Sequence, residues 1–434
     1  MKVRKIILTT ILLAIFGTAF ATDFNTSFHN STLRIDYTFT GNASVQMISV
    51  KELKKLPEWH GRRTNMQSVP LDGNGILTLY DAATGTILYK SSFSSLFQEW
   101  LSTPEATEIN KSFEFTILVP QTQKEAIAEI VLYNNKAEAT ATLRHNINPT
   151  DVLIRDLSGQ QPQPHKYIHK GGNPAECIDV AIVAEGYTKK EMKLFLKDAE
   201  TAAQEILNYT PFNKYADRFN FVAVMSPSDD SDVSTPQDNS WKQTAINSNF
   251  MTFYSPRYLT TNSIHTLHDK LANIPYEHII VLANTDTYGG GGIYNSLTLT
   301  TAHHSSFKPV VVHEFGHSFG GLADEYFYEQ GDVLDGTYSL QHEPWEPNIT
   351  TLVDFGSKWE DMMPVGVERP SEPTDERKAS YTVGLYEGGG YQTKGIYRPT
   401  VVCRMRDNAS ERFCPVCERS LEEVILHQTE ERNP

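Results

Sequence analysis

One short stretch constrains this chain more than any other, the run from Val310 to Tyr326, which reads VVVHEFGHSFGGLADEY. His313 and His317 are four residues apart, so on a helix both imidazoles lie on one face and can reach one ion. Glu314 follows the first histidine and is expected to face the same cleft. This H-E-x-x-H spacing is typical of helices in which two neutral imidazoles hold Zn²⁺ beside a carboxylate that takes a proton from water.

The residues around the motif favour a metal site over a chance match in a helix whose histidines are merely packed or solvated. Val310–Val312 predict a buried helix start, and the glycine pair 320–321 predicts its end, because glycine tolerates a positive φ. A third ligand must come from after that turn. Asp324 is the first choice and Glu325 the rival. Because the two point in different directions on a regular backbone, we do not expect both to bind one ion; the other is free for a hydrogen bond to a ligand histidine.

The stretch resembles the long zinc signature of the metzincin metallopeptidases, and it is most similar to the IgA-peptidase-type family of secreted bacterial metallopeptidases. The third-ligand position of the general metzincin pattern falls here on Ala323, which cannot bind metal, and Asp324 lies one residue later. The resemblance implies a peptidase with one Zn²⁺ per chain, held by His313, His317 and Asp324. In such an enzyme Glu314 is the general base.

A second group of residues near the C-terminus is similar to the same family. In metzincins a methionine in a tight turn forms an apolar floor beneath the zinc-binding imidazoles. Met405, in a Cys-x-Met setting, matches that role, with Met362 and Met363 as competitors. Tyrosines near such a turn assist the oxyanion in some metzincins. The candidates implied here are Tyr397, which is preferred, then Tyr391 and Tyr326.

The first 21 residues have the pattern of a secretory signal peptide. Three basic residues open the chain, a short apolar run from 6 to 16 follows, and Ala19-Phe20-Ala21 offers a cleavage site. The run is too short to span a bilayer and no later segment is apolar enough, so no membrane span is expected. We therefore expect a secreted or periplasmic protein whose mature chain begins near Thr22.

The rest of the chain predicts two domains of a mixed α+β and α/β protein. Residues 22–157 are expected to form an antiparallel β-sandwich, because alternating apolar runs such as Leu33–Phe39 and Phe113–Val119 recur at regular spacing. Segment 158–174 contains Pro and Gly clusters and predicts a linker. In 175–434 strands alternate with helices, which predicts a metzincin-like zinc peptidase domain with a mixed sheet and an active-site helix.

The four cysteines allow more than one interpretation. Cys177 is remote, whereas Cys403, Cys414 and Cys417 lie within one short stretch. In an exported protein, disulfides or free structural thiols are favoured. The alternative is a second metal, bound by these three cysteines and a distant residue.

Two further segments have candidate roles. The acidic loop Ser228–Asp232 could hold Ca²⁺, although it lacks a recognised ligand spacing and a solvated loop is the simpler interpretation. The glycine run 289–292 would let another backbone approach closely. Similarity to metzincins makes Ile293–Thr300 a candidate edge strand for pairing with extended substrate, with a flexible loop as the alternative.

Charge and motif together narrow the function. The formal net charge of −15 disfavours nucleic-acid binding, which needs clustered Lys and Arg. The expected function is a secreted zinc endopeptidase acting on a protein or glycoprotein substrate. The alternatives are a zinc-dependent amidase acting on cell-wall or glycoprotein material, or a non-catalytic binding protein with a structural metal. Structural zinc sites usually have four protein ligands, and Glu314 next to His313 favours catalysis.

Overall fold

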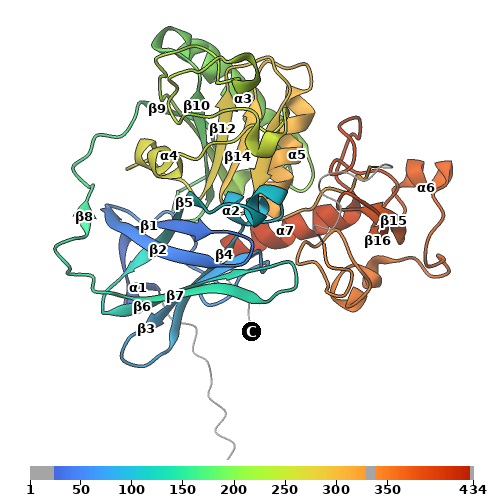
Figure 1. The fold of residues 1–434 in the computed structure, drawn as a ribbon, viewed down its shortest axis with the longest axis horizontal. Coiled ribbons are helices and arrows are strands. Elements are labelled where there is room, and N and C mark those ends of the chain that lie inside the picture. Colours follow the sequence, from blue (N-terminus) through green and yellow to red (C-terminus); the bar gives the residue numbers. More distant parts are fainter. Residues whose placement is uncertain (1–23, 329–337, 431–434) are drawn as a thin grey trace, which may run out of the picture.

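The computed structural model describes residues 24–328 and 338–430. The expected signal peptide and the expected mature start near Thr22 lie outside these ranges. A β-rich N-terminal domain is followed by an α/β domain with a C-terminal layer packed beside it (Figure 1). This confirms the mixed fold class. Within the described ranges, no helix is both long and apolar enough to cross a bilayer.

The N-terminal domain is a two-layer β-structure. Its elements are α1 (Phe24–Ser27), β1 (Phe28–Gly41), β2 (Gln46–Leu56), β3 (Gly75–Asp81), β4 (Ile87–Phe93), α2 (Leu96–Trp100), the 3₁₀ helix η1 (Pro104–Thr107), β5 (Lys111–Thr122), β6 (Ala126–Tyr133), β7 (Ala139–Ile147) and β8 (Arg155–Asp156). The strand orders of the two sheets are β5-β1-β2-β8 and β4-β3-β6-β7. Alternate apolar residues of β1, such as Leu33 and Phe39, pack with Leu77 and Ile130 of the other sheet in one core. The alternation in the sequence thus builds the layer interface.

The α/β domain and its C-terminal layer hold the remaining elements. They are β9 (His165–Lys170), β10 (Ile178–Glu185), η2 (Lys189–Glu191), α3 (Met192–Asn208), η3 (Ala216–Arg218), β11 (Phe219–Val224), η4 (Pro236–Asp238), η5 (Thr252–Tyr254), α4 (Ile264–Lys270), β12 (His278–Ala283), β13 (Gly290–Ile293), β14 (Leu297–Thr301), α5 (Phe307–Gly320), η6 (Phe355–Ser357), η7 (Glu360–Met362), α6 (Asp375–Ser380), β15 (Tyr386–Gly389), β16 (Gln392–Arg398) and α7 (Pro415–Thr429).

Six of these strands form one mixed sheet in the order β13-β14-β12-β10-β11-β9. The four inner strands run parallel, and β9 and β13 are antiparallel edges. Helices α3 and α5 cover one face and α4 the other (Figure 1). Strand β9 lies inside segment 158–174, which the sequence predicts to be a linker. Its backbone pairs with β11, so this part of the segment is a strand despite the Pro and Gly residues around it. The edge next to α5 is β13, which ends at Ile293, whereas β14, which covers the second half of Ile293–Thr300, is an inner strand.

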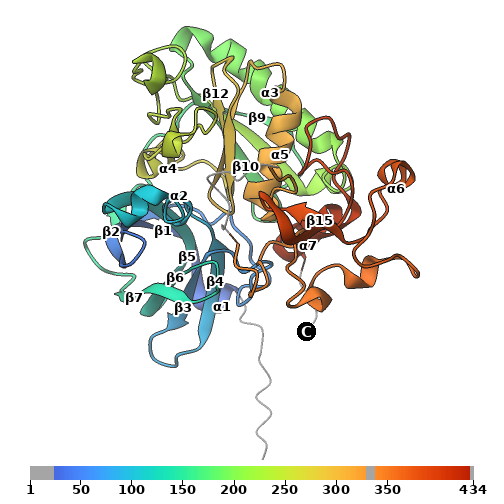
Figure 2. The same ribbon diagram turned by 45° about the vertical axis from the view of Figure 1, so that its right-hand side comes forward.

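Helix α5 is central to this domain. Its valines pack in the core between the sheet and α7, and the helix ends where Gly321 adopts a left-handed conformation with φ of 58°. This confirms the predicted glycine stop. Figure 2 shows α7 and the β15–β16 hairpin next to the lower end of α5. The residues after the zinc motif are therefore folded back beneath the helix that carries it.

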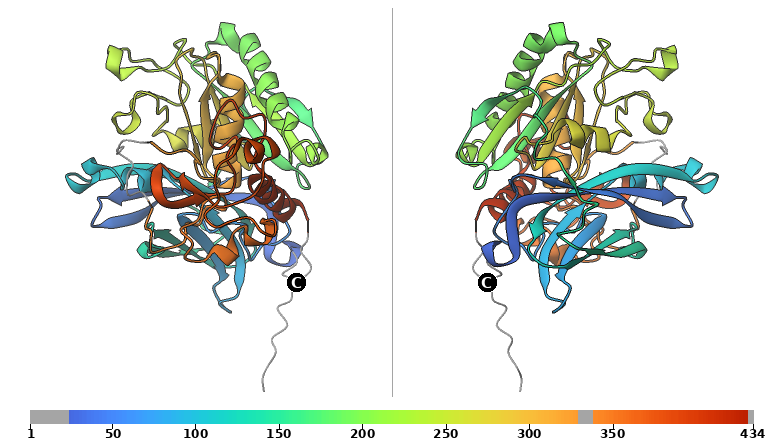
Figure 3. Two further views of the ribbon diagram at one scale, coloured as in Figure 1. Left: turned by 90° about the vertical axis from the view of Figure 1, so that its right-hand side faces the viewer. Right: turned by 90° about the vertical axis from the view of Figure 1, so that its left-hand side faces the viewer.

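Buried charges join the two domains. Arg34 Nη1 donates to Asp269 Oδ1 of α4 at 2.6 Å, and Lys54 Nζ donates to the same oxygen at 2.9 Å. Asp36 pairs with Arg34 at 2.7 Å and with Lys54 at 3.0 Å. Arg34 and Asp36 face away from the sandwich core, yet both are fully buried because the α/β domain covers that face. The blue and teal strands lie directly beneath the green and yellow sheet (Figure 3).

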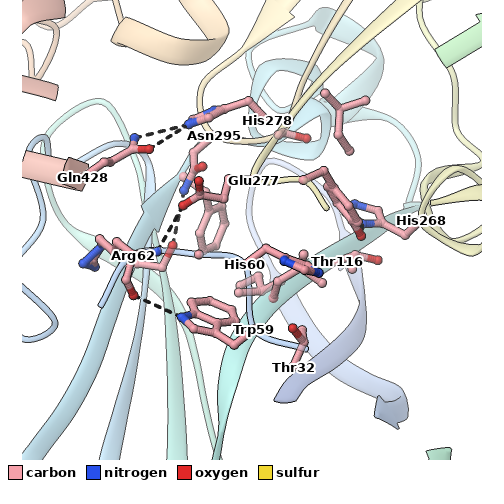
Figure 4. A pocket seen from close by; sticks show the side chains of 18 of the residues that line it. Thr32, Trp59, His60, Arg62, Thr116, His268, Glu277, His278, Asn295 and Gln428 are labelled. Carbon is pink, nitrogen blue, oxygen red and sulfur yellow. Dashed lines mark hydrogen bonds between the residues drawn. The ribbon is translucent and has the colours of Figure 1, made fainter. Parts of the chain in front are cut away.

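A cavity of about 290 Å³ lies along the same seam. Trp59, His60 and Arg62 line it from the N-terminal domain, and Glu277 and His278 from the α/β domain (Figure 4). The backbone N–H of Arg62 donates to Glu277 Oε1 at 3.1 Å, so this polar contact also holds the domains together. Phe319 of α5 is among the residues that line it, but His313, Glu314, His317 and Asp324 are not.

Candidate metal centre

Three potential ligand atoms converge beside the C-terminal half of α5. His313 Nε2 lies 3.0 Å from His317 Nε2 and 3.0 Å from Asp324 Oδ1, and His317 Nε2 lies 3.3 Å from the same carboxylate oxygen. The helix supplies both histidines one turn apart, and the turn at Gly321 returns the chain so that Asp324 meets them. The three side chains are at most 15% exposed. The structure thus brings together the three ligands expected from the sequence.

The hydrogen bonds of the imidazoles fit a cation at this point. His313 Nδ1 bonds the carbonyl oxygen of Arg404 at 2.9 Å, and His317 Nδ1 bonds that of Leu322 at 2.5 Å. A carbonyl oxygen only accepts, so both Nδ1 atoms carry hydrogen and, in neutral rings, both Nε2 atoms present lone pairs. Two lone pairs and a carboxylate oxygen then face one another. Tetrahedral zinc with nitrogen and oxygen ligands separates them by roughly 3.3 Å, close to the distances here.

The electrostatics of the centre favour the charged forms of Asp324 and His317. Burial raises the pKa of Asp324, but the charge of His317 and the hydrogen bonds with both histidines outweigh it and hold that pKa well below its usual range. Burial lowers the pKa of His317, but Asp324 overcomes this and raises it to about 9. The carboxylate therefore attracts positive charge to this point, whether from a proton or a metal ion.

Glu314 lies beside this triad, between α5 and the edge strand β13. Its side chain is partly exposed, and Gly290 of β13 faces it. A Cβ at Gly292 would lie 2.2 Å from the carbonyl oxygen of Glu314 and 2.8 Å from Cβ of His317, so only glycine allows β13 to approach the helix this closely. Burial raises the pKa of Glu314 above its ordinary value even though both histidines oppose the change. A raised pKa suits a carboxylate that must accept a proton near neutral pH.

Of the three candidate tyrosines, Tyr391 and Tyr326 lie at the centre and Tyr397 does not. The Tyr391 hydroxyl donates to Asp324 Oδ2 at 2.5 Å, and the Tyr391 and Tyr326 rings are 5.4 Å apart. Tyr397 lies on β16, where its backbone pairs with Thr350, and the charged groups that affect its hydroxyl are Glu387 and Lys394. The structure thus places Tyr391, and not the preferred Tyr397, next to the expected metal ligands. Tyr391 sits at the hairpin turn with φ of 67°, and its backbone N–H donates to the carbonyl oxygen of Tyr326 at 3.0 Å.

Met405 lies beneath α5. It is fully buried and its sulfur packs against Gly316, next to His317. The preceding residue, Arg404, supplies the carbonyl that fixes the His313 ring. Met362 and Met363 are only partly buried at the margin of the same core. Met405 is thus the methionine placed to support the histidines.

Asn348 is a functional neighbour that the sequence did not single out. Its side chain exchanges two hydrogen bonds with the backbone of Ala323, at 2.7 and 2.9 Å, and donates to Glu325 Oε1 at 3.0 Å. These bonds hold the segment that carries Asp324. The sequence offers one indication of this role: Asn348 lies in the long irregular region after the H-E-x-x-H motif, and such regions commonly shape a cleft.

Comparison with known protein families covers most of the chain. The family model described as IgA Peptidase M64 matches residues 167–382 and 373–425, and the model described as Peptidase M64 N-terminus matches residues 23–144. The chain belongs to the IgA peptidase M64 family. A search of curated proteins found no match. Membership makes the protein a peptidase with a protein substrate and suggests a metal cofactor, and it confirms the resemblance carried by the zinc motif.

This M64 peptidase has a second group of potential ligands in the described part of the chain: Glu325, Cys403, Cys414 and Cys417. The three cysteines, like Cys177, are free and buried. The sequence suggested that whichever of Asp324 and Glu325 is not a ligand would hydrogen-bond His313 or His317. Glu325 does not do so, because the Nδ1 atoms of both rings bond backbone carbonyls instead. Neighbouring acidic side chains thus enter different clusters: Asp324 lies with the two histidines and Glu325 with the three cysteines.

The acidic loop Ser228–Asp232 is not among the clusters found in the described residues. Asp230 Oδ2 accepts a hydrogen bond from the backbone N–H of Gln243 at 2.8 Å, and Ser231 donates to Glu191 at 2.8 Å. These contacts give polar groups of the loop partners within the protein. A role in binding Ca²⁺ stays a prediction for this M64 peptidase.

Proposed function

We propose that this M64 peptidase is an exported zinc endopeptidase of metzincin-like design. The observation that carries the proposal is the convergence of His313 Nε2, His317 Nε2 and Asp324 Oδ1 within 3.3 Å, with Glu314 beside them. Three protein ligands leave one tetrahedral position open, which is the usual arrangement of catalytic zinc. The turn after α5 that supplies the third ligand, and Met405 beneath the histidines, support the metzincin comparison.

The roles of the chain's own residues follow from this arrangement. His313, His317 and Asp324 would hold the ion, which when bound supplies Lewis-acid chemistry for activating water and polarising the scissile carbonyl. Glu314 accepts a proton from the attacking water and delivers it to the leaving amine. We assign Tyr391, rather than Tyr397, as the donor to the developing oxyanion, because its O–H lies at the centre and would turn to the oxyanion from Asp324 Oδ2.

An extended substrate would lie along β13. This strand is the sheet edge next to α5 and offers backbone groups for pairing, although Tyr258 already bridges it at Gly290. Backbone pairing suits cleavage within a chain more than removal of a small amide group. This favours an endopeptidase over an amidase, and the partly exposed Glu314 favours either enzyme over a binding protein with a structural metal.

Export rests on the pattern of residues 1–21, which carry a basic start, an apolar run and an A-x-A cleavage site. The mature chain would then begin near Thr22 in a secreted or periplasmic location. N-terminal sequencing of exported material tests this, and an uncleaved Met1 would contradict it.

Zinc analysis combined with a diverse peptide library tests the enzymatic proposal. The purified protein is expected to cleave internal peptide bonds, to lose that activity on chelation and to regain it with Zn²⁺. His313→Ala is expected to lose both the zinc of this centre and the activity. Full activity of the chelated protein, or of His313→Ala, would refute the proposal.

A further inference from the structure

The second ligand cluster has the composition of a closed metal site. We propose that Cys403, Cys414, Cys417 and Glu325 bind a second, structural Zn²⁺ beneath the three-ligand centre. The proposal goes beyond the catalytic zinc and does not depend on it. Thiolates and one carboxylate in a tetrahedral set suit zinc, and four protein ligands leave no position for a substrate or water.

The ligand atoms are already at the spacing that such a site needs. All four lie within 4.8 Å of one another. Cys403 Sγ lies 3.7 Å from Cys417 Sγ, and Glu325 Oε1 lies 3.2 Å from Cys417 Sγ and 3.9 Å from Cys414 Sγ. Zinc with bonds of about 2.3 Å to sulfur and about 2.1 Å to oxygen would separate these atoms by roughly 3.5–3.8 Å. Only small side-chain movements would therefore complete the tetrahedron.

An independent observation indicates that a ligand is needed here. Glu325 is completely buried, and its Oε2 atom has no hydrogen-bond partner in the described part of the chain. A buried carboxylate oxygen without a partner is costly unless a cation neutralises it. Asn348 satisfies only Oε1. The unpaired oxygen lies on the carboxylate that the three sulfurs surround, so one cation there would serve all four side chains.

The backbone around the cysteines favours thiolates. N–H groups of Met405 and Cys414 donate to Cys403 Sγ at 3.4 and 3.2 Å, and the N–H of Cys417 points to Cys414 Sγ at 3.5 Å. Cys414 is the N-cap of α7, where the helix dipole stabilises negative charge. Three thiolates and one carboxylate carry more negative charge than one Zn²⁺ neutralises. The guanidinium groups of Arg398 and Arg406 interact electrostatically with Glu325 and offset this excess.

A disulfide accounts for the cluster less well. Joining two of the three cysteines would leave the third thiol and the Glu325 carboxylate buried together with no cation. The two sulfurs of Cys403 and Cys417 are 3.7 Å apart, whereas a disulfide bond is about 2.05 Å long. The metal therefore explains all four residues, and a disulfide explains two.

The site would connect the segments that build the catalytic centre. Cys403 and Met405 belong to one turn, and the Glu325 N–H donates to the Met405 carbonyl at 2.8 Å. The Arg404 carbonyl of the same turn fixes the His313 ring, and Asp324 precedes Glu325 in the chain. One ion at the cysteines would thus tie α7 to the methionine turn and to the segment carrying the third catalytic ligand.

Metal and thiol counting on the purified full-length mature protein tests the proposal. We expect two zinc ions per chain and four titratable thiols after denaturation with chelator. His313→Ala should retain one zinc, and the same variant loaded with Co²⁺ should show a near-ultraviolet sulfur-to-cobalt charge-transfer band. Cys417→Ser should lose the second zinc, whereas Cys177→Ser, which alters a buried cysteine outside the cluster, should keep both.

The outcomes separate this site from the catalytic one. Two thiols instead of four, or cobalt bound without a thiolate band, would refute the cysteine site while leaving the catalytic proposal intact. If the wild type holds only one zinc and His313→Ala retains it, the result would support the cysteine site and refute the catalytic zinc. If Cys417→Ser fails to fold, the thiol count of the wild type and the cobalt spectrum of His313→Ala still decide the question.

Discussion

Removal of the Tyr391 hydroxyl is the sharpest single-atom test of how the catalytic centre is organised. Tyr391→Phe keeps the ring that packs 5.4 Å from Tyr326 and deletes only the hydrogen bond to Asp324 Oδ2. The acceptor is a carboxylate whose side chain is 6% exposed, so the bond is charge-assisted and shielded from water. Such bonds contribute ~1.5–3 kcal/mol. We expect kcat/KM to fall roughly 10- to 100-fold.

Tyr397→Phe is the matched control, since it removes the same atom from the same hairpin. Its hydroxyl lies near Glu387 and Lys394 rather than at the metal ligands, so the change in kcat/KM should stay within about twofold. Peptide-cleavage kinetics and competition with a zinc chelator would be measured for both variants. Weaker zinc binding by Tyr391→Phe would mean that the hydroxyl mainly positions Asp324, whereas a lower kcat with unchanged zinc affinity would mean that it contacts the oxyanion. A larger loss for Tyr397→Phe than for Tyr391→Phe would refute the assignment.

Two further predictions concern stability. Asp36→Asn should lower the free energy of unfolding by about 2 kcal/mol, because the cations paired with Asp36 overcome its burial and hold its pKa at about 2 instead of 3.8. This contribution is present above about pH 4 and is lost as the pH falls through the folded pKa. The control is Glu200→Gln, in an exposed ion pair, which should change the free energy of unfolding measured in urea by less than about 0.5 kcal/mol. Gly292→Ala should destabilise by ~1–3 kcal/mol and lower activity, since its Cβ would push β13 away from α5. Gly159→Ala, where a Cβ meets nothing within 4 Å, is the control, and equal effects would contradict the close-approach argument.

Spacing along the sequence was enough to predict that His313, His317 and Asp324 lie together. His313 and His317 are one helical turn apart, and the glycine turn that follows places Asp324 only a few residues later, so these relations depend on short-range geometry. The alternation of β1 likewise indicated which face lines the sandwich core. Periodicity predicts such features because each depends on neighbours in sequence.

Contacts between segments far apart in the chain could not be predicted from the sequence. Tyr391 bonds Asp324 across 67 residues, and Cys417 meets Glu325 across 92, so their partners are fixed by how the chain folds back. The sequence favoured Tyr397, but in the structure Tyr391, at the turn of the hairpin, lies next to Asp324. The Pro and Gly clusters around β9 predict a linker, because local composition gives no information on the pairing of this strand with β11.

The central claim is that Glu314 is the general base of a centre at which His313, His317 and Asp324 would hold Zn²⁺, which would supply Lewis-acid activation of the attacking water. The most direct measurement is zinc content and peptide-cleavage rate of Glu314→Gln, which keeps the shape of the side chain and removes the base. The account predicts the zinc content of the wild type and a fall in kcat of roughly 10²- to 10⁴-fold. Near-normal cleavage by a zinc-loaded Glu314→Gln protein would contradict it.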